Sequence, residues 1–231
     1  MRKLYMTPLS PFARKIRIVL IEKGLDFEED LARGIRPAQE IGAVNPALTI
    51  PVLVDGDLTL FDSALIAEYL FETYPNARTD ASPPLAETMV RPDQRWRDRK
   101  VLGIMQTVLE TAVALHIFCG IGIMPAQVSY LQRHQKRLVS CLDWLEEQAT
   151  PEGFVPGWFT AMDIALICAL GLIDASNEHR FPPDAPMVTW RGRPNLEEVV
   201  QRFSERPSVR ETSPRGFVPV SRDRYIADML A

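Results

Sequence analysis

Apolar residues in the first third of the chain repeat first with helical and then with strand spacing. From residue 11 to residue 22 they return every three or four positions, which predicts a helix with Arg14, Lys15 and Arg17 on its other faces. Ser10 and Pro11 suit the cap and first position of that helix, and Gly24 suits its end. The sequence therefore predicts a hydroxyl at the positive end of a helix, where negative charge is stabilised.

Shorter patterns surround this helix. Runs typical of strands occupy residues 4–6, 25–31, 50–54 and 58–61. Further helices are predicted at 37–43 and 63–74, and Asp55-Gly56-Asp57 is typical of a hairpin turn. The predicted order, β-α-β-α-β-β-α, is that of a compact α/β domain.

Strand patterns nearly disappear after residue 86. Residues 77–86 are rich in Pro, Ser, Asp and Ala, which is typical of a linker. Long helical patterns then cover 92–118, 128–150, 164–173 and 194–203. The third of these is apolar on every side and follows a capping box, Thr160 with Asp163, so it belongs at the centre of a bundle. We predict an α/β domain at 1–76, a linker at 77–86, an all-helical domain at 87–213 and a tail at 214–231.

Composition narrows the class of protein. The chain has 231 residues, 46% of them apolar, and a net charge of −4, which is typical of a globular protein without the basic field that nucleic acid or anionic lipid requires. We therefore expect neither a nucleic-acid nor a membrane partner. The three cysteines lack C-x-x-C spacing, which favours reduced thiols and a cytoplasmic location. The three histidines, His116, His134 and His179, lack the spacing of a metal site, so no metal is expected.

Five short motifs, in this order and spacing, resemble the glutathione S-transferase family. They are Ser10-Pro11-Phe12-Ala13-Arg14-Lys15, Asn45-Pro46 leading to Ile50-Pro51-Val52-Leu53, Phe61-Asp62-Ser63, Thr160 with Asp163, and Arg206-Pro207-Ser208-Val209. The resemblance covers nearly the whole chain and is greatest to bacterial transferases with a serine at the first helix. It implies a thioredoxin-like α/β N-terminal domain, an all-α C-terminal helical bundle and a homodimer.

The resemblance implies a detoxification enzyme that joins the glutathione thiol to a small hydrophobic electrophile, with Ser10 as its catalytic residue. The Ser10 hydroxyl would donate a hydrogen bond to the glutathione thiolate. Lowering a thiol pKa by about two units requires about 2.7 kcal/mol. One charge-assisted hydrogen bond of about 1.5–3 kcal/mol and a helix N-terminus of about 0.3–1 kcal/mol supply that energy. The alternative is that Ser10 only caps its own helix.

The resemblance also implies which residues bind glutathione. They are Phe12, Thr49, Ile50, Pro51, Asp62 and Ser63. Pro51 would be cis, so that the backbone of Ile50 pairs with the cysteinyl part of glutathione; otherwise it is a trans proline at a strand start. Asp62 and Ser63 would bind the γ-glutamyl group, or only cap the third helix.

Thr49 departs from the family pattern, because many relatives have Lys or Gln there. A short neutral side chain does not pair with the glycyl carboxylate in the same way. Arg36 is a candidate to supply that charge from the loop before the second helix, but a solvated surface residue is the favoured interpretation.

For the co-substrate, the resemblance implies an apolar site between the domains, with Leu9, Phe12, Trp96 and Arg99 as candidates. Trp96 could instead lie in the bundle core, and Arg99 in an exposed ion pair. Residues 214–231 could cover the site or pack on the bundle.

Two other functions stay open. One is a glutathione-dependent thiol or disulfide reductase, against which the absence of a cysteine at position 10 counts. The other is a non-catalytic protein that keeps the fold for protein partners, an alternative that the Thr49 departure keeps open because the fold does not determine the function.

Overall fold

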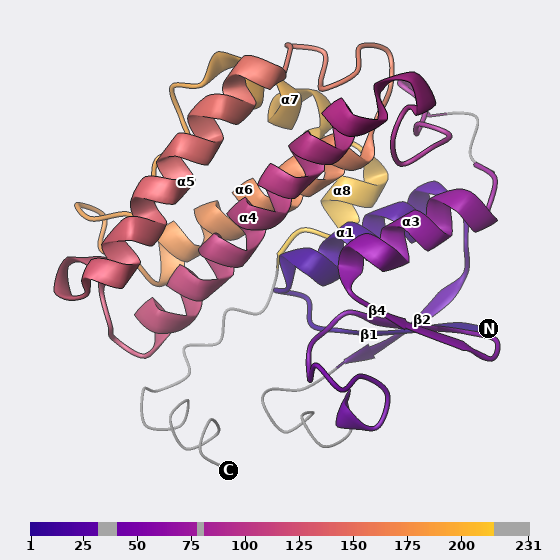
Figure 1. The fold of residues 1–231 in the computed structure, drawn as a ribbon, viewed down its shortest axis with the longest axis horizontal. Coiled ribbons are helices and arrows are strands. Elements are labelled where there is room, and N and C mark those ends of the chain that lie inside the picture. Colours follow the sequence, from indigo (N-terminus) through magenta and orange to yellow (C-terminus); the bar gives the residue numbers. More distant parts are fainter. Residues whose placement is uncertain (32–40, 78–80, 215–231) are drawn as a thin grey trace.

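The computed structural model describes residues 1–31, 41–77 and 81–214, which form an α/β domain packed against a helical domain (Figure 1). Four strands make the sheet: β1 (Arg2–Met6), β2 (Phe27–Leu31), β3 (Val52–Asp55) and β4 (Leu58–Phe61), in the order β2-β1-β3-β4. β1 pairs with β2 in parallel, whereas the pairs of β1 with β3 and of β3 with β4 are antiparallel. This mixed sheet followed by a helical domain confirms the predicted fold class.

Two helices pack beside each other on this sheet, α1 (Pro11–Glu22) and α3 (Ser63–Thr73) (Figure 1). Leu4 and Met6 of β1 are fully buried, and Tyr5 between them is only partly buried, as the period of two along a strand requires. Gly24 follows α1 with φ of 64°, a left-handed conformation that glycine adopts without a steric penalty. Most of the helix predicted at 37–43 lies outside the described residues.

The helical domain begins with a short 3₁₀ turn, η1 (Pro92–Gln94). The elements that follow are α4 (Arg95–Gly120), η2 (Pro125–Gln127), α5 (Ser129–Gln148), α6 (Ala161–His179), α7 (Pro194–Ser204) and α8 (Pro207–Glu211). Every residue of α6 from Ala161 to Leu170 is buried, which confirms its predicted place at the centre of the bundle. In the described part of the chain, the stretch Pro92–Gly120 alone has the length and composition of a membrane span, a test that core helices of soluble proteins also pass.

The sequence predicts Arg14 and Lys15 on faces of the first helix that its apolar residues do not occupy, and the interface between the domains covers these faces too. Both side chains are buried, because α1 lies between α3 of its own domain and α6 and α8 of the other. Arg14 donates hydrogen bonds to the carbonyls of Ile167 at 3.2 Å and Val209 at 3.1 Å. Its guanidinium therefore joins the two domains by satisfying carbonyl groups of the helical domain.

Trp96 does not lie in the bundle core, the alternative position that the sequence left open for it. Trp96 is 77% exposed and Met105 is buried. Nine residues separate them, which is two and a half turns of an α-helix, so the two side chains point in opposite directions.

Candidate functional site

The strand register brings three predicted parts of the site together, at the end of the sheet where β1 and β4 finish and β3 begins. Tyr5 of β1 lies opposite Val52 of β3, and Val52 lies opposite Phe61 of β4. The segment that follows Tyr5 contains Ser10, the segment that precedes Val52 contains Ile50 and Pro51, and the segment that follows Phe61 contains Asp62 and Ser63. These residues are therefore neighbours in space, although about 50 positions of sequence separate the first from the last.

Ser10 is the N-cap of α1. Its hydroxyl oxygen accepts a hydrogen bond from the backbone N–H of Ala13 at 3.2 Å, and its own N–H donates to the Thr7 carbonyl at 3.1 Å. The capping role is thus present. The side chain is half-buried, and no described residue accepts a hydrogen bond from its hydroxyl hydrogen. Because a hydroxyl is both donor and acceptor, Ser10 can cap its helix and still donate to an anion at the same place.

The peptide bond between Ile50 and Pro51 is cis, which confirms the predicted isomer. Ile50 is half-buried, and among the described residues neither its N–H nor its C=O has a hydrogen-bond partner. Ile50 lies just before β3, outside the strand pairing of the sheet, so its free backbone groups can pair with an extended peptide.

Thr49 is exposed, and Asn45 fixes its backbone and its hydroxyl. The side-chain amide of Asn45 donates to the Thr49 carbonyl at 2.7 Å and to its hydroxyl at 3.1 Å. Asn45 is fully buried and fixes this loop, a role that the sequence reasoning missed even though Asn-Pro is a typical loop signal. Arg36, the candidate to replace the charge missing at Thr49, lies outside the described residues.

Asp62 caps α3 from a left-handed backbone conformation, with φ of 70° and ψ of 119°. A non-glycine residue in this region is uncommon and occurs often at functional sites. One oxygen of its carboxylate accepts from the N–H groups of Ala64 at 2.8 Å and Leu65 at 3.0 Å. The other oxygen has no described donor, and Ser63 lies buried beside it at the start of the helix. Capping and ligand binding are therefore compatible here too.

The candidate residues for the co-substrate site lie in different places in the structure. Leu9 and Phe12 are half-buried and pack against the core next to Ser10. Arg99 forms an ion pair with Glu68 of α3 and lines a cavity of about 260 Å³ between the domains. Trp96 is exposed and is not in the bundle core.

The thiols of the described chain lie in the helical domain rather than at this edge of the sheet. Cys119 and Cys168 are buried and Cys141 is half-buried, and all three are free. Burial raises the pKa of Cys119 to about 12 and that of Cys168 to about 11, so these groups are thiols at neutral pH. Within the part of the chain that the structure describes, no group of three His, Cys, Asp or Glu side chains is placed to hold a metal ion.

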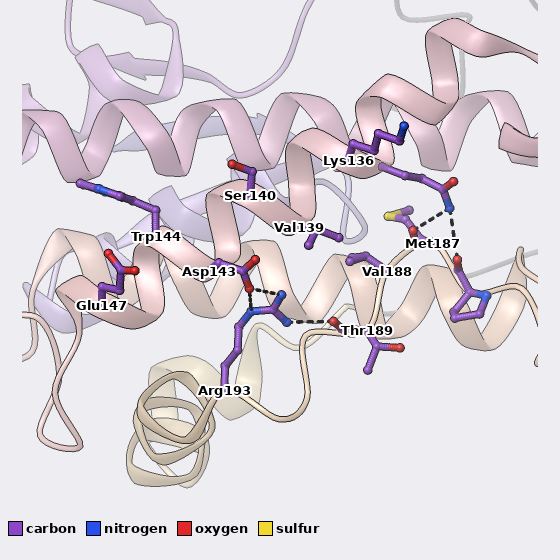
Figure 2. A pocket seen from close by; sticks show the side chains of 12 residues that line it. Lys136, Val139, Ser140, Asp143, Trp144, Glu147, Met187, Val188, Thr189 and Arg193 are labelled. Atoms are coloured by element: carbon purple, nitrogen blue, oxygen red, sulfur yellow. Dashed lines mark hydrogen bonds and ion pairs between the residues drawn. The ribbon is translucent and has the colours of Figure 1, made fainter.

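A wide groove on the helical domain lies along α5, beyond α4 from the sheet (Figures 1 and 2). Val139 of α5 faces Val188 in it, Trp144 lines it further along α5, and Arg193 pairs with Asp143 at 2.6 Å. None of the predicted site residues lines this groove, and the Arg193 charge is neutralised within it.

Comparison with known proteins matches both domains to one family. The model described as "Glutathione S-transferase, N-terminal domain" matches residues 4–78, and "Glutathione S-transferase, C-terminal domain" matches residues 128–202. Glutathione S-transferase 3 of Zea mays is 29% identical over 214 residues, which cover 91% of this chain and 92% of that protein. A glutathione S-transferase of Methylobacillus flagellatus, solved with GSH bound, has a TM-score of 0.73 at 25% identity and covers 93% of this chain and 100% of its own.

Three of the similar proteins carry a different name, stringent starvation protein A homolog. A stringent starvation protein A homolog of Coxiella burnetii is 38% identical over 88 residues, which cover 38% of this chain and 42% of that protein. The similarity to this relative is therefore local.

Proposed function

We propose, from the premise that the chain belongs to the glutathione S-transferase family, that it binds glutathione and activates the thiol for conjugation to a small hydrophobic electrophile. The observation that carries the proposal is the place of the Ser10 hydroxyl. It lies at the N-terminus of α1 and keeps a donor that no described residue uses. This donor and the positive end of the helix both favour a thiolate over a thiol.

The other residues at the sheet edge suit the rest of the tripeptide. The N–H and C=O of Ile50 can pair with the cysteinyl residue, and the unoccupied carboxylate oxygen of Asp62 can accept from the γ-glutamyl ammonium. The N-terminus of α3, where Ser63 lies, suits the γ-glutamyl carboxylate. With a chlorinated nitroaromatic probe, the thiolate would attack the carbon that carries chlorine, form the S–C bond and release chloride.

The test uses Ser10→Ala and Ser10→Asp together. Both variants lose the hydroxyl donor, so we expect kcat/KM for 1-chloro-2,4-dinitrobenzene to fall about 10- to 150-fold, from a hydrogen bond of about 1.5–3 kcal/mol. The ultraviolet absorbance of bound thiolate should also disappear at neutral pH. Aspartate caps helices well, so Ser10→Asp should unfold like the wild type, whereas Ser10→Ala should lose about 1 kcal/mol. Wild-type activity in Ser10→Ala would remove Ser10 from the mechanism.

The local similarity to the stringent starvation protein A homolog favours a second candidate, a non-catalytic protein that uses this fold for protein partners. The exposed, uncharged Thr49 is consistent with weak glutathione binding. Retention of the protein on immobilised glutathione, with elution by free glutathione, would support the transferase. Passage through the column at neutral pH would support the second candidate.

We also propose a homodimer. Three large apolar side chains are exposed on neighbouring elements: Phe61 at the end of β4, Leu65 on α3 and Trp96 on α4. Their exposed fractions are 36%, 49% and 77%, and apolar side chains gathered in this way are typical of an interface. Because β4 and α3 belong to the α/β domain and α4 to the bundle, a two-fold axis can pair each domain with the neighbour's other domain.

A further inference from the structure

The charged residues of α5 are separated along its length. Its Lys and Arg residues all precede Ser140 and its Asp and Glu residues all follow it: Arg133, Lys136 and Arg137, then Asp143, Glu146 and Glu147. The helix dipole favours the opposite order, with acids near the N-terminus and cations near the C-terminus. Residues four positions apart on one face also carry like charges, Arg133 with Arg137 and Asp143 with Glu147, which repel each other. Within α5 itself, this order of charges is therefore destabilising.

Few of these charges are used inside the chain. Glu146 accepts from the backbone N–H groups at the start of α7. Asp143 accepts from Arg193 through Oδ1 alone, so its Oδ2 has no described donor. The others are exposed, and among the described residues their side chains take part in no hydrogen bond or ion pair: Arg133, Lys136, Arg137 and Glu147.

The free charges lie on the outward side of α5 in a symmetric arrangement. Arg133 lies seven positions before Ser140 and Glu147 seven positions after it, which is about two turns in each direction and keeps all three on one line of the helix. Lys136 and Asp143 both line the groove beside α5, four positions before Ser140 and three positions after it (Figure 2). Reversing the direction of α5 about Ser140 therefore exchanges the places of cations and acids.

We propose that α5 binds the α5 of a second copy of this chain, antiparallel and about a two-fold axis near Ser140. Arg133 then meets the partner subunit's Glu147, and Lys136 meets the partner subunit's Asp143. Each pair occurs twice, because residues across a two-fold interface contact each other reciprocally. A small crossing angle, typical of antiparallel helix pairs, keeps the side chains within reach along this length.

The groove adds an apolar strip beside these ion pairs. Val139 of α5 is 41% exposed there and faces Val188. Burial of these side chains against a second copy adds stabilisation that is not sensitive to charge. One helix pair nevertheless buries less than the roughly 800 Å² per partner of a standard interface, so the contact is expected to be weak and to form well above micromolar concentration.

This surface is separate from the one proposed for the homodimer. α5 lies on the outer side of the helical domain, with α4 between it and the α/β domain (Figure 1). Phe61 and Leu65 belong to the α/β domain, and Trp96 lies on α4. The α5 contact can therefore form with or without the homodimer, and the proposal does not depend on glutathione chemistry.

The experiment measures molar mass by sedimentation equilibrium on the full-length protein with Phe61→Asp, which is designed to remove the homodimer. Between about 10 and 300 µM we expect the mass to rise from that of one chain to that of two and then to stop, because a two-fold contact closes after two copies. An increase in NaCl from about 0.1 to 1 M shortens the Debye length from about 10 to 3 Å and should weaken this association at least tenfold.

Two charge reversals, added separately to this protein, test the proposed pairs. Arg133→Glu and Glu147→Lys each turn two attractions into two repulsions, so each should raise the dissociation constant at least tenfold. They change the net charge of −4 in opposite directions, so net charge alone does not explain a loss in both. Each also removes a like-charge pair within α5, so neither should lower the temperature of unfolding.

An equimolar mixture of the two variants gives the sharpest test. The new acid of one variant then meets the new lysine of the other, and the unchanged Arg133 and Glu147 meet as well. Association of the mixture should therefore return to within about threefold of the unreversed protein. The matched controls are Arg210→Glu and Glu211→Lys, the same charge changes at exposed positions of α8, and these should leave the association unchanged.

Four results would overturn the proposal: a constant molar mass up to 300 µM, equal association in the reversed and unreversed proteins, a mixture that associates no better than either variant alone, or association that strengthens with salt. The last result would indicate contact through the apolar groove rather than through the charges of α5.

Discussion

Asp163 is a fully buried carboxylate that fixes the start of α6. Its oxygens accept from the backbone N–H groups of Thr160 at 2.8 Å and Phe154 at 3.1 Å, and from the Thr160 hydroxyl at 2.5 Å. Burial raises its pKa to about 6, although these hydrogen bonds favour the charged form. Desolvation is therefore the larger of the two effects.

This shift predicts how pH changes stability through Asp163. The pKa of Asp163 in the folded protein lies above its value of about 3.9 in the unfolded chain. Its contribution to the free energy of unfolding is therefore fully present below pH 4 and is lost as pH rises through 6. For Asp163→Asn, which mimics the protonated acid, the free energy of unfolding relative to the wild type should increase by about 2–3 kcal/mol between pH 4 and pH 7. Urea titrations of both proteins measure this difference, and a constant difference would contradict the assignment.

At the scale of elements, the short helix α8 is anchored to α1 by a buried ion pair. Arg206 Nε and Nη2 donate to the two oxygens of Glu22 at 2.7 and 2.6 Å, and Ser208 donates to the same carboxylate. Arg206 also stacks over the ring of Phe159 at 4.4 Å and donates to the Pro83 carbonyl. One guanidinium thus connects α1, the segment before α4, the start of α6 and α8.

Breaking this pair should therefore destabilise the whole chain. Glu22→Gln leaves the Arg206 charge buried without its partner, and we expect a loss of about 3–5 kcal/mol in the free energy of unfolding. The matched control is Asp143→Asn, which breaks the more exposed pair with Arg193 and should cost at most about 1 kcal/mol. Equal losses in the two variants would show that the buried pair has no special role.

At the scale of the whole molecule, the exposed apolar side chains predict an assembly. Phe61→Asp places a charge at the centre of the proposed interface. The molar mass measured by sedimentation at micromolar concentration should therefore fall from that of a dimer to that of a monomer. Tyr130→Asp removes a similarly exposed aromatic side chain, 50% exposed on α5, and should leave the dimer intact. A wild-type monomer at that concentration would contradict the proposal. The cytoplasmic location, the domain boundaries and the identity of the electrophile stay predictions.

The sequence by itself determined the features that arise from residues close together in the chain. Ser10 with Pro11, Thr160 with Asp163, and Gly24 mark helix ends correctly, because capping involves residues within one turn of each other. The strand and helix order was predictable for the same reason, since hydrophobic periodicity is local. The cis bond at Pro51 followed from the family resemblance.

The tertiary structure alone decided which charged and apolar side chains are covered. Arg14 and Lys15 occupy polar positions of an amphipathic pattern, yet a second domain packs on that face of α1 and buries both. Trp96 fits an apolar pattern, yet its side chain is exposed and does not pack in the bundle core. The contact of Arg99 with Glu68 and the cavity beside Lys15 are equally invisible in sequence, because burial depends on the packing of elements that are far apart in the chain.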